Sequence, residues 1–225
     1  MTEVKFCGLT RPEDAELAAS LGARYVGVIF AEGPRLLTDD QARVVLERVP
    51  MGVSRVGVFG DAKPEQIAMR ADKLGLDVVQ LHGDPKPRTI TRVRKHWQGR
   101  IWAVQRVNGA EIPPAASDLF DAADAIVLDS RVADKLGGTG VVLPWDELRD
   151  HIASIRTSRT RLVLAGGLNP ENVRRAIASL APDVVDVSSG VESSAGVKDH
   201  EKMRAFRDAV MGVGVAGSGA SDGTP

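Results

Sequence analysis

The sequence is poor in cysteine and has no excess of charge of either sign. Cys7 is the one cysteine in 225 residues, which excludes a disulfide framework and a zinc site built from several cysteines. Lys and Arg number 29 against 30 Asp and Glu, so no basic footprint for nucleic acid or an anionic membrane exists. No apolar run approaches the roughly 20 residues that span a bilayer, and no secretory signal opens the chain. We therefore expect a cytoplasmic protein without nucleic-acid or membrane partners.

Short β-branched runs alternate along the chain with amphipathic segments. Several of these runs are almost entirely apolar, as strands covered on both faces are. Strands are expected at residues 4–7, 25–30, 54–59, 78–81, 101–104, 125–128, 162–164 and 184–187. The clearest helices are expected at residues 14–21, 38–49, 64–74 and 170–180, and further helices are expected at 144–152 and 199–210.

Eight strands, each followed by a crossover, predict parallel pairing and a single-domain (β/α)₈ TIM barrel of class α/β. An open doubly wound sheet is the alternative, but it usually carries an early G-x-G-x-x-G, which is lacking after the first strand here. The barrel is expected to cover residues 1–211. Residues 212–225 are rich in Gly, Ser and Ala and are expected to form a flexible tail.

Two glycine-containing loops follow the last two strands. Gly166 and Gly167 come after the seventh strand, and Ser188, Ser189 and Gly190 come after the eighth. Glycines let the backbone approach a ligand, N–H groups at helix N-termini attract anions, and hydroxyls add further donors. Either loop alone could be a tight strand-to-helix turn. Together they predict a phosphate site, because phosphate commonly binds at these two loops in a barrel.

Cys7 and Asp129 are the candidate base and acid. Cys7 shares a strand face with Lys5, whose charge would lower the thiol pKa and suit it to act as base or nucleophile. The alternative for Cys7 is a small buried hydrophobe. Asp129 ends an apolar strand, where partial desolvation raises a carboxyl pKa and suits it to donate a proton. Its alternative is to cap its own loop.

Four further polar residues are candidates for substrate binding. Arg35 lies in a turn and can clamp a carboxylate, although exposed loop arginines are often only solvated. Gln80 and His82 share a strand face, from which His82 could bind substrate. The alternative for His82 is that it is a structural histidine held by hydrogen bonds. Asp186 either reaches substrate hydroxyls or pairs with Lys5. No His, Asp or Glu cluster has metal-ligand spacing, so no metal is expected.

Taken in their order along the chain, these segments resemble the phosphoribosylanthranilate isomerase family from Lys5 to about Phe206. The matching pieces are KFCGLT (5–10), VF (58–59), VQLHG (79–83), LDS (128–130), GGTG (137–140), LAGGLNPENV (164–173) and DVSSGVE (186–192). The first and last of them are specific to the family. The glycine pairs alone occur in many phosphate-binding barrels.

The resemblance implies an Amadori rearrangement in tryptophan biosynthesis, without cofactor or metal. N-(5-phosphoribosyl)anthranilate would become 1-(2-carboxyphenylamino)-1-deoxyribulose 5-phosphate. The family's general base and general acid correspond to Cys7 and Asp129, and its carboxylate-binding arginine corresponds to Arg35. Its phosphate grip corresponds to the two glycine-containing loops. The expected partner is thus a small-molecule phosphosugar-anthranilate substrate, with the protein a monomer or homodimer.

Two features depart from the family pattern. Gly33 precedes Pro34 and Arg35 where the family usually has Ser, and the GGTG loop continues with Val141 where the family usually has Lys. Residues 130–143 are expected to form a long active-site loop, whose manner of closure the missing lysine leaves open. Two other functions also stay open. A histidine-pathway isomerase performs the same rearrangement on an aminoimidazole, with Asp in place of Cys7, and an inert barrel would bind analogues without turnover.

Overall fold

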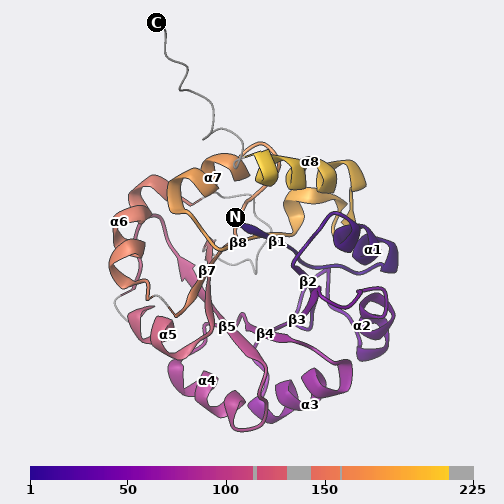
Figure 1. The fold of residues 1–225 in the computed structure, drawn as a ribbon. Coiled ribbons are helices and arrows are strands. Elements are labelled where there is room, and N and C mark those ends of the chain that lie inside the picture. Colours follow the sequence, from indigo (N-terminus) through magenta and orange to yellow (C-terminus); the bar gives the residue numbers. More distant parts are fainter. Residues whose placement is uncertain (114–115, 131–142, 158, 213–225) are drawn as a thin grey trace, which may run out of the picture.

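The structure is a computed structural model that describes residues 1–113, 116–130, 143–157 and 159–212. Eight parallel strands pair in sequence order and close into a barrel, because β1 pairs with both β2 and β8. Helices surround the barrel as an outer ring (Figure 1). The predicted (β/α)₈ TIM barrel is therefore confirmed. Of the tail predicted at 212–225, only Gly212 lies within the described residues, and it ends the last helix.

The elements follow the predicted alternation of strands and helices. The barrel strands are β1 (Glu3–Phe6), β2 (Tyr25–Ile29), β3 (Ser54–Phe59), β4 (Val78–Leu81), β5 (Arg100–Val107), β6 (Ala125–Ser130), β7 (Arg161–Leu164) and β8 (Val184–Val187). The helices are α1 (Pro12–Ser20), α2 (Asp39–Leu46), α3 (Pro64–Leu74), α4 (Pro87–Arg94), α5 (Ala116–Ala122), α6 (Trp145–Ile155), α7 (Val173–Leu180) and α8 (His200–Met211). The sequence patterns single out neither α4, which buries only two side chains, nor α5, which has only seven residues.

The start of α7 differs from its prediction. The helix begins at Val173 and not at residue 170. The reason is local, because the Asn169 side chain accepts hydrogen bonds from the backbone N–H groups of Glu171 and Asn172 and so holds a turn. This turn continues the glycine-containing loop after β7 by several residues.

The inside of the barrel changes from apolar to polar along its strands. Side chains alternate between the two faces of a strand, so residues two apart point the same way. An apolar cluster is formed by Tyr25, Val56, Val78, Trp102, Val104, Ala125, Val127, Val163, Ala165 and Val184. Two residues further along β4, β6 and β8, the same face carries Gln80, Asp129 and Asp186. The apolar cluster thus fills one end of the barrel and leaves polar groups at the C-terminal ends of the strands.

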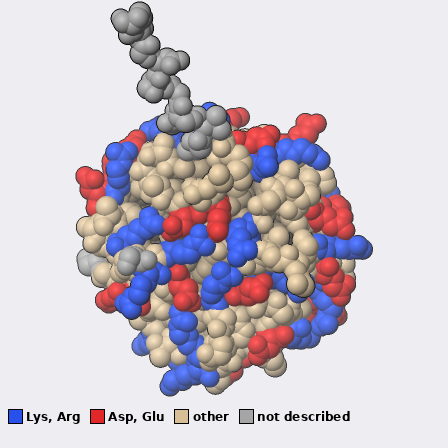
Figure 2. All heavy atoms as spheres, viewed as in Figure 1, with Lys and Arg blue, Asp and Glu red and all other residues tan. Residues whose placement is uncertain are grey.

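The surface carries charges of both signs. On the face shown in Figure 2, Lys and Arg lie beside Asp and Glu, and neither sign covers a continuous area. Among the helices of the described ranges, none has both the length and the apolar character that crossing a bilayer requires.

Candidate active site

A pocket at the C-terminal ends of the strands is lined by every residue predicted for the site. These residues are Cys7, Arg35, Gln80, His82, Asp129, Gly166, Gly167, Asp186, Ser188, Ser189 and Gly190. They come from the ends of β1, β4, β6, β7 and β8 and from the loop between β2 and α2. The barrel therefore brings together side chains that lie up to 183 residues apart in the chain. The GGTG loop predicted at 130–143 falls at residues 131–142 outside the described part, so its role stays a prediction.

Cys7 lies directly after β1 and faces the pocket with only 6% of its surface exposed. Gly27 on the neighbouring strand β2 makes the space for it. A Cβ atom at Gly27 would stand 2.9 Å from the Cys7 Sγ and 3.3 Å from the Lys5 Cε, which is closer than ordinary packing allows. The thiol and the Lys5 side chain therefore occupy a recess that requires glycine on the adjacent strand.

The pKa of the Cys7 thiol is raised in this recess. Burial is the largest cause, because it disfavours the thiolate. The charge of Lys5 acts in the opposite direction, as the sequence predicts, but it does not outweigh burial. The thiol is therefore protonated at neutral pH, and a basic role for Cys7 requires its proton to leave during the reaction.

Lys5 is fully buried and joins Asp186 to Gln80. Its Nζ donates to the Asp186 Oδ2 at 2.6 Å and to the Gln80 Oε1 at 3.0 Å. Burial disfavours the charged ammonium, but Asp186 and Cys7 outweigh it, so the pKa of Lys5 is raised. The second oxygen of Asp186, Oδ1, is buried and has no hydrogen-bond partner in the described part of the chain. Asp186 thus pairs with Lys5 and still presents an acceptor for a substrate hydroxyl.

Asp129 lies near the end of β6, and burial raises its pKa to about 6. The negative charge of Asp186 adds to the shift, whereas a hydrogen bond from the Ser130 N–H opposes it. Gly166 keeps the space beside the carboxyl open, because a Cβ there would stand 2.8 Å from the Asp129 Oδ1. A carboxyl with this pKa stays partly protonated near neutral pH and can donate a proton.

His82 lies beside Asp129 in the pocket. The His82 Nε2 lies 4.0 Å from the Asp129 Oδ2. Burial first, and then the charge of Arg106, lower the pKa of His82 to about 4, so the ring is neutral at neutral pH. The ring Nδ1 is buried, and within the described ranges it lacks a hydrogen-bond partner. The neutral ring can therefore form a hydrogen bond with a polar atom of a ligand in the pocket.

The loops after β7 and β8 form one continuous surface. Gly166 and Gly167 adopt positive φ angles of 80° and 68°, a backbone conformation that glycine favours. At Gly190, a Cβ atom would stand 1.9 Å from the carbonyl oxygen of Leu168, so only glycine fits where the two loops touch. This close contact holds both predicted phosphate-binding segments in one place.

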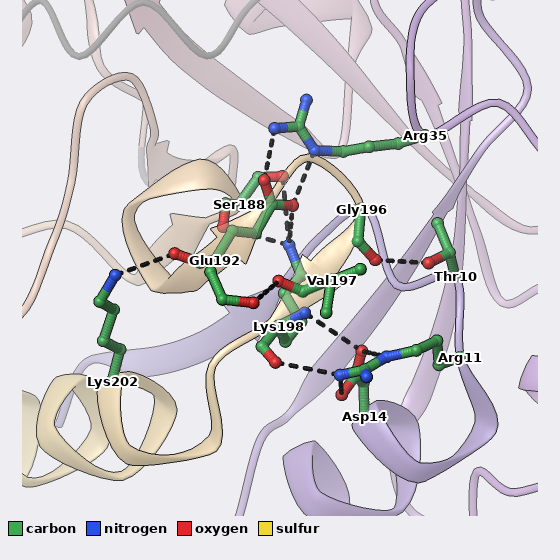
Figure 3. Close-up of polar contacts among 11 residues, drawn as sticks. Thr10, Arg11, Asp14, Arg35, Ser188, Glu192, Gly196, Val197, Lys198 and Lys202 are labelled. Atoms are coloured by element: carbon green, nitrogen blue, oxygen red, sulfur yellow. Dashed lines mark hydrogen bonds and ion pairs between the residues drawn. The ribbon is translucent and has the colours of Figure 1, made fainter.

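Arg35 does not stand alone in the pocket wall. Its Nε donates to the Glu192 Oε1 at 2.8 Å and its Nη2 donates to the Glu192 Oε2 at 2.6 Å (Figure 3). Lys198 completes the group, since its Nζ donates to the Glu192 Oε1 at 2.7 Å and to the Ser188 carbonyl at 3.1 Å. Although burial opposes ionisation, Arg35 and Lys198 hold the pKa of Glu192 below its usual value.

Glu192 and Lys198 are functional-site residues that the sequence pattern does not predict. They lie on β9 (Glu192–Ser194) and β10 (Val197–Lys198), a short hairpin that follows β8 and turns through Gly196. The two-residue connection Ala195-Gly196 is not one of the usual hairpin turn sequences, so the local signal for this element is weak. Nothing local indicates that Glu192 meets Arg35, because the two residues lie 157 positions apart.

In the described ranges, His, Cys, Asp and Glu side chains form no group of three that is suited to hold a metal ion. The pocket instead combines a thiol, a carboxyl of raised pKa, a neutral imidazole and a glycine-rich wall. This combination suits acid–base chemistry on a phosphorylated substrate.

Comparison with known proteins gives one consistent result. The family model described as N-(5'phosphoribosyl)anthranilate (PRA) isomerase matches residues 4–209. The N-(5'-phosphoribosyl)anthranilate isomerase of Syntrophus aciditrophicus (strain SB) is 44% identical over 211 residues, which cover 93% of this chain and 87% of the relative. The crystal structure of phosphoribosyl anthranilate isomerase from Thermotoga maritima matches with a TM-score of 0.85 and 33% identity, over 94% of this chain and 100% of that one. A phosphoribosyl anthranilate isomerase solved in complex with reduced 1-(o-carboxyphenylamino)-1-deoxyribulose 5-phosphate matches with a TM-score of 0.81 and 32% identity. This match also covers 94% of this chain and 100% of that one.

Proposed function

We propose roles for the residues of this pocket from one premise: the chain belongs to the N-(5'-phosphoribosyl)anthranilate isomerase family. It is an isomerase of tryptophan biosynthesis that converts N-(5-phosphoribosyl)anthranilate into 1-(2-carboxyphenylamino)-1-deoxyribulose 5-phosphate by an Amadori rearrangement. The region that matches the family model contains every described residue of the pocket. The roles of individual residues follow from the chemistry that this reaction requires.

The rearrangement needs two proton transfers at separate atoms. An acid must protonate the ring oxygen of the ribose so that the ring opens to a Schiff base. A base must then remove the proton from C2′, which gives an enolamine that tautomerises to the ketone. A positioned acid or base contributes roughly 10²- to 10⁴-fold to the rate of such a step.

Asp129 acts as the acid and Cys7 as the base. The Cys7 thiol first releases its proton to water, and the thiolate then takes the proton from C2′. The raised pKa of Asp129, about 6, keeps part of its population protonated at neutral pH. Cys7 opens on the same pocket from β1, whereas Asp129 comes from β6, so the two groups approach the sugar from separate sides. The strands β7 and β8 lie between them around the barrel. This placement of a thiol and a protonatable carboxyl around one pocket is the single observation that carries the proposal.

The phosphate of the substrate binds at the loops after β7 and β8, through Gly166, Gly167, Ser188, Ser189 and Gly190. These loops lie between the strands that supply the acid and the base, so a phosphate held there places the ribose within reach of both. Binding energy from this non-reacting end orients the sugar for the two proton transfers.

The remaining pocket residues bind the rest of the substrate. Arg35 takes the anthranilate carboxylate, because a guanidinium matches a carboxylate in geometry and charge. Asp186 accepts from a ribose hydroxyl through its unpaired oxygen, and His82 offers its neutral ring beside Asp129. Gln80 holds the ammonium of Lys5 in place. None of these roles uses a cofactor or a metal.

We further propose that the enzyme works in the cytoplasm, where the thiol of Cys7 stays reduced. Its partner is the small-molecule substrate, without nucleic acid or membrane. The Thermotoga maritima relative is dimeric, and monomers were generated from it. A monomer or a homodimer suits this chain equally, since every pocket residue described above comes from one chain. Sedimentation of the purified protein measures which form it takes.

A direct assay tests the proposed function. Phosphoribosylanthranilate is fluorescent, so we expect its fluorescence to decay when the purified protein is added. The aminoimidazole substrate of the histidine pathway should not be converted, because Cys7 replaces the aspartate which that family uses. Tight binding of substrate analogues without any turnover would instead identify an inert barrel and would contradict the proposal.

A further inference from the structure

The group formed by Arg35, Glu192 and Lys198 is more elaborate than binding a carboxylate requires. One arginine with a free guanidinium could clamp the substrate by itself. Here the carboxylate of Glu192 already occupies one edge of that guanidinium, with both oxygens engaged. Glu192 and Lys198 are 8% and 2% exposed, so two charges are buried beside the pocket. Burying them is unfavourable unless they are paired, which indicates a specific use.

The geometry leaves part of Arg35 available to a ligand. A guanidinium carries five N–H donors on three nitrogens, and Glu192 takes one from Nε and one from Nη2. In Figure 3 the third nitrogen points away from Glu192. Gly8 makes room for the rest of the side chain, because a Cβ atom there would stand 2.5 Å from the Arg35 Cδ. Arg35 therefore passes close to the backbone at Gly8, and the outer edge of its guanidinium faces away from Glu192.

The hairpin that carries Glu192 and Lys198 is itself held firmly. The Thr10 hydroxyl donates to the carbonyl of Gly196 at its turn. The Arg11 Nη2 donates to the carbonyl of Lys198 at 3.0 Å, and the N–H of Lys198 donates to the buried carboxylate of Asp14 at 3.4 Å. These contacts, visible in Figure 3, attach the hairpin to the loop after β1 and to α1. Glu192 is thus a fixed anchor and not a mobile surface side chain.

Lys198 extends the connection to the phosphate loop. Its ammonium neutralises Glu192 and also donates to the carbonyl of Ser188, which lines the pocket after β8. The three side chains together carry one net positive charge, since two cations flank one carboxylate. Under the proposed function, Arg35 and Ser188 hold opposite ends of one substrate. Glu192 therefore lies in the chain of contacts that sets where the two ends can bind.

We propose that Glu192 is a positioning residue that orients Arg35 and thereby makes the enzyme selective for phosphosugars that carry an aromatic carboxylate. The inference rests on the proposed function, because it assumes that Arg35 receives that carboxylate. Without Glu192, the long arginine side chain would sample several rotamers, and binding would cost the entropy of ordering it. The loss should therefore fall on ligands with the carboxylate and spare those without it.

The test compares two ligands with Glu192→Gln, which removes the charge and keeps the shape. One ligand is the reduced product analogue, and the other is the same molecule without its carboxylate. We expect calorimetry to show binding of the first weakened about tenfold or more, the size of one charge-assisted hydrogen bond. Binding of the second should change less than about threefold. In steady-state assays, KM for phosphoribosylanthranilate should rise more than kcat falls.

Three variants control the comparison. Glu201→Gln makes the same change at an exposed position on α8 and should bind both ligands like the wild type. Glu192→Asp keeps the charge on a side chain one carbon shorter, so it should weaken binding of the first ligand less than Glu192→Gln does. If Glu192→Gln fails to fold by circular dichroism, Glu192→Asp carries the test, because its partial loss should still fall on the first ligand and not on the second. In an Arg35→Ala background, Glu192→Gln should have no further effect on carboxylate binding, because the two residues act as one unit.

Two results would overturn the inference. Equal weakening of both ligands would show that Glu192 supports only the fold, and so would an undiminished effect in the Arg35→Ala background. Failure of the proposed function has a different signature, namely that the wild-type protein does not convert phosphoribosylanthranilate at all. The two failures are therefore separable.

Discussion

Replacing Asp129 with Asn should make the protein more stable and far less active. Burial raises the pKa of this carboxyl from 3.8 to about 6, so the ionised form is disfavoured in the folded protein. Between these two pH values the folded chain binds more protons than the unfolded chain. Stability therefore falls as pH rises through this window, and the full penalty is present above pH 6. Asparagine has nearly the same shape and carries no charge, so it avoids the penalty.

The size of the effect follows from the two pKa values. A separation of about two units corresponds to about 3 kcal/mol at pH 8, because each unit is worth about 1.4 kcal/mol. At pH 4.5 the same two pKa values give a smaller loss of stability, about 1 kcal/mol. The Asn variant should thus exceed the wild type in free energy of unfolding by an amount that grows with pH. The same substitution should lower kcat by at least about 100-fold, since the acid is lost.

Urea unfolding of both proteins at pH 4.5 and pH 8, followed by circular dichroism, measures the difference. Asp150→Asn is the matched control, because Asp150 is exposed on α6 and its replacement should change stability by less than about 0.5 kcal/mol at either pH. Equal stability of the wild type and the Asp129→Asn variant at pH 8 would refute the reasoning, because it would mean that burial does not disfavour the carboxylate. Wild-type turnover of the variant would remove Asp129 from the mechanism.

Three further predictions concern the other side of the pocket. Cys7→Ala should lower kcat in the fluorescence assay by at least about 100-fold, and turnover at the wild-type rate would exclude the thiol as base. Lys5→Met should raise the pKa of the Cys7 thiol further, because the largest charge that lowers this pKa is lost. Ultraviolet absorbance of the thiolate measures the titration of Cys7 alone, because the sequence has no other cysteine. An unchanged titration curve would disprove the influence of Lys5. Gly27→Ala should lower kcat about tenfold or more by displacing the thiol, since the added Cβ would stand 2.9 Å from Sγ, and an unaltered kcat would contradict the steric argument.

The barrel was predictable because its signals are local. Apolar runs such as the one that forms β2 are typical of strands covered on both faces, and eight strands with crossovers leave few architectures. Most pocket residues were predictable for a related reason, since all except Arg35 lie at or just past the end of such a run. Once the strands close into a barrel, their C-terminal ends meet. Short helices were harder to predict, because α4 has only eight residues and buries only Ile90 and Val93, so its apolar pattern repeats too few times to stand out in the sequence.

The direction of the thiol pKa was not predictable from the sequence. Lys5 lies on the same strand face as Cys7, and its charge acts in the predicted direction. Burial of Cys7 depends on atoms from other strands, including the recess beside Gly27, and it outweighs that charge. Electrostatics in a folded protein depends on how much water remains around a group, which adjacent residues do not determine.

The residues themselves determined the strands, the barrel and the positions of thiol, carboxyl and glycine loops, because alternation and chain direction act over a few neighbours. Tertiary structure alone decided that Lys5 pairs with Asp186, 181 residues away, and that Glu192 meets Arg35. Such pairs form only when strand order and register bring distant segments to the same end of a closed sheet. Their strength depends on burial, which is a property of the whole fold.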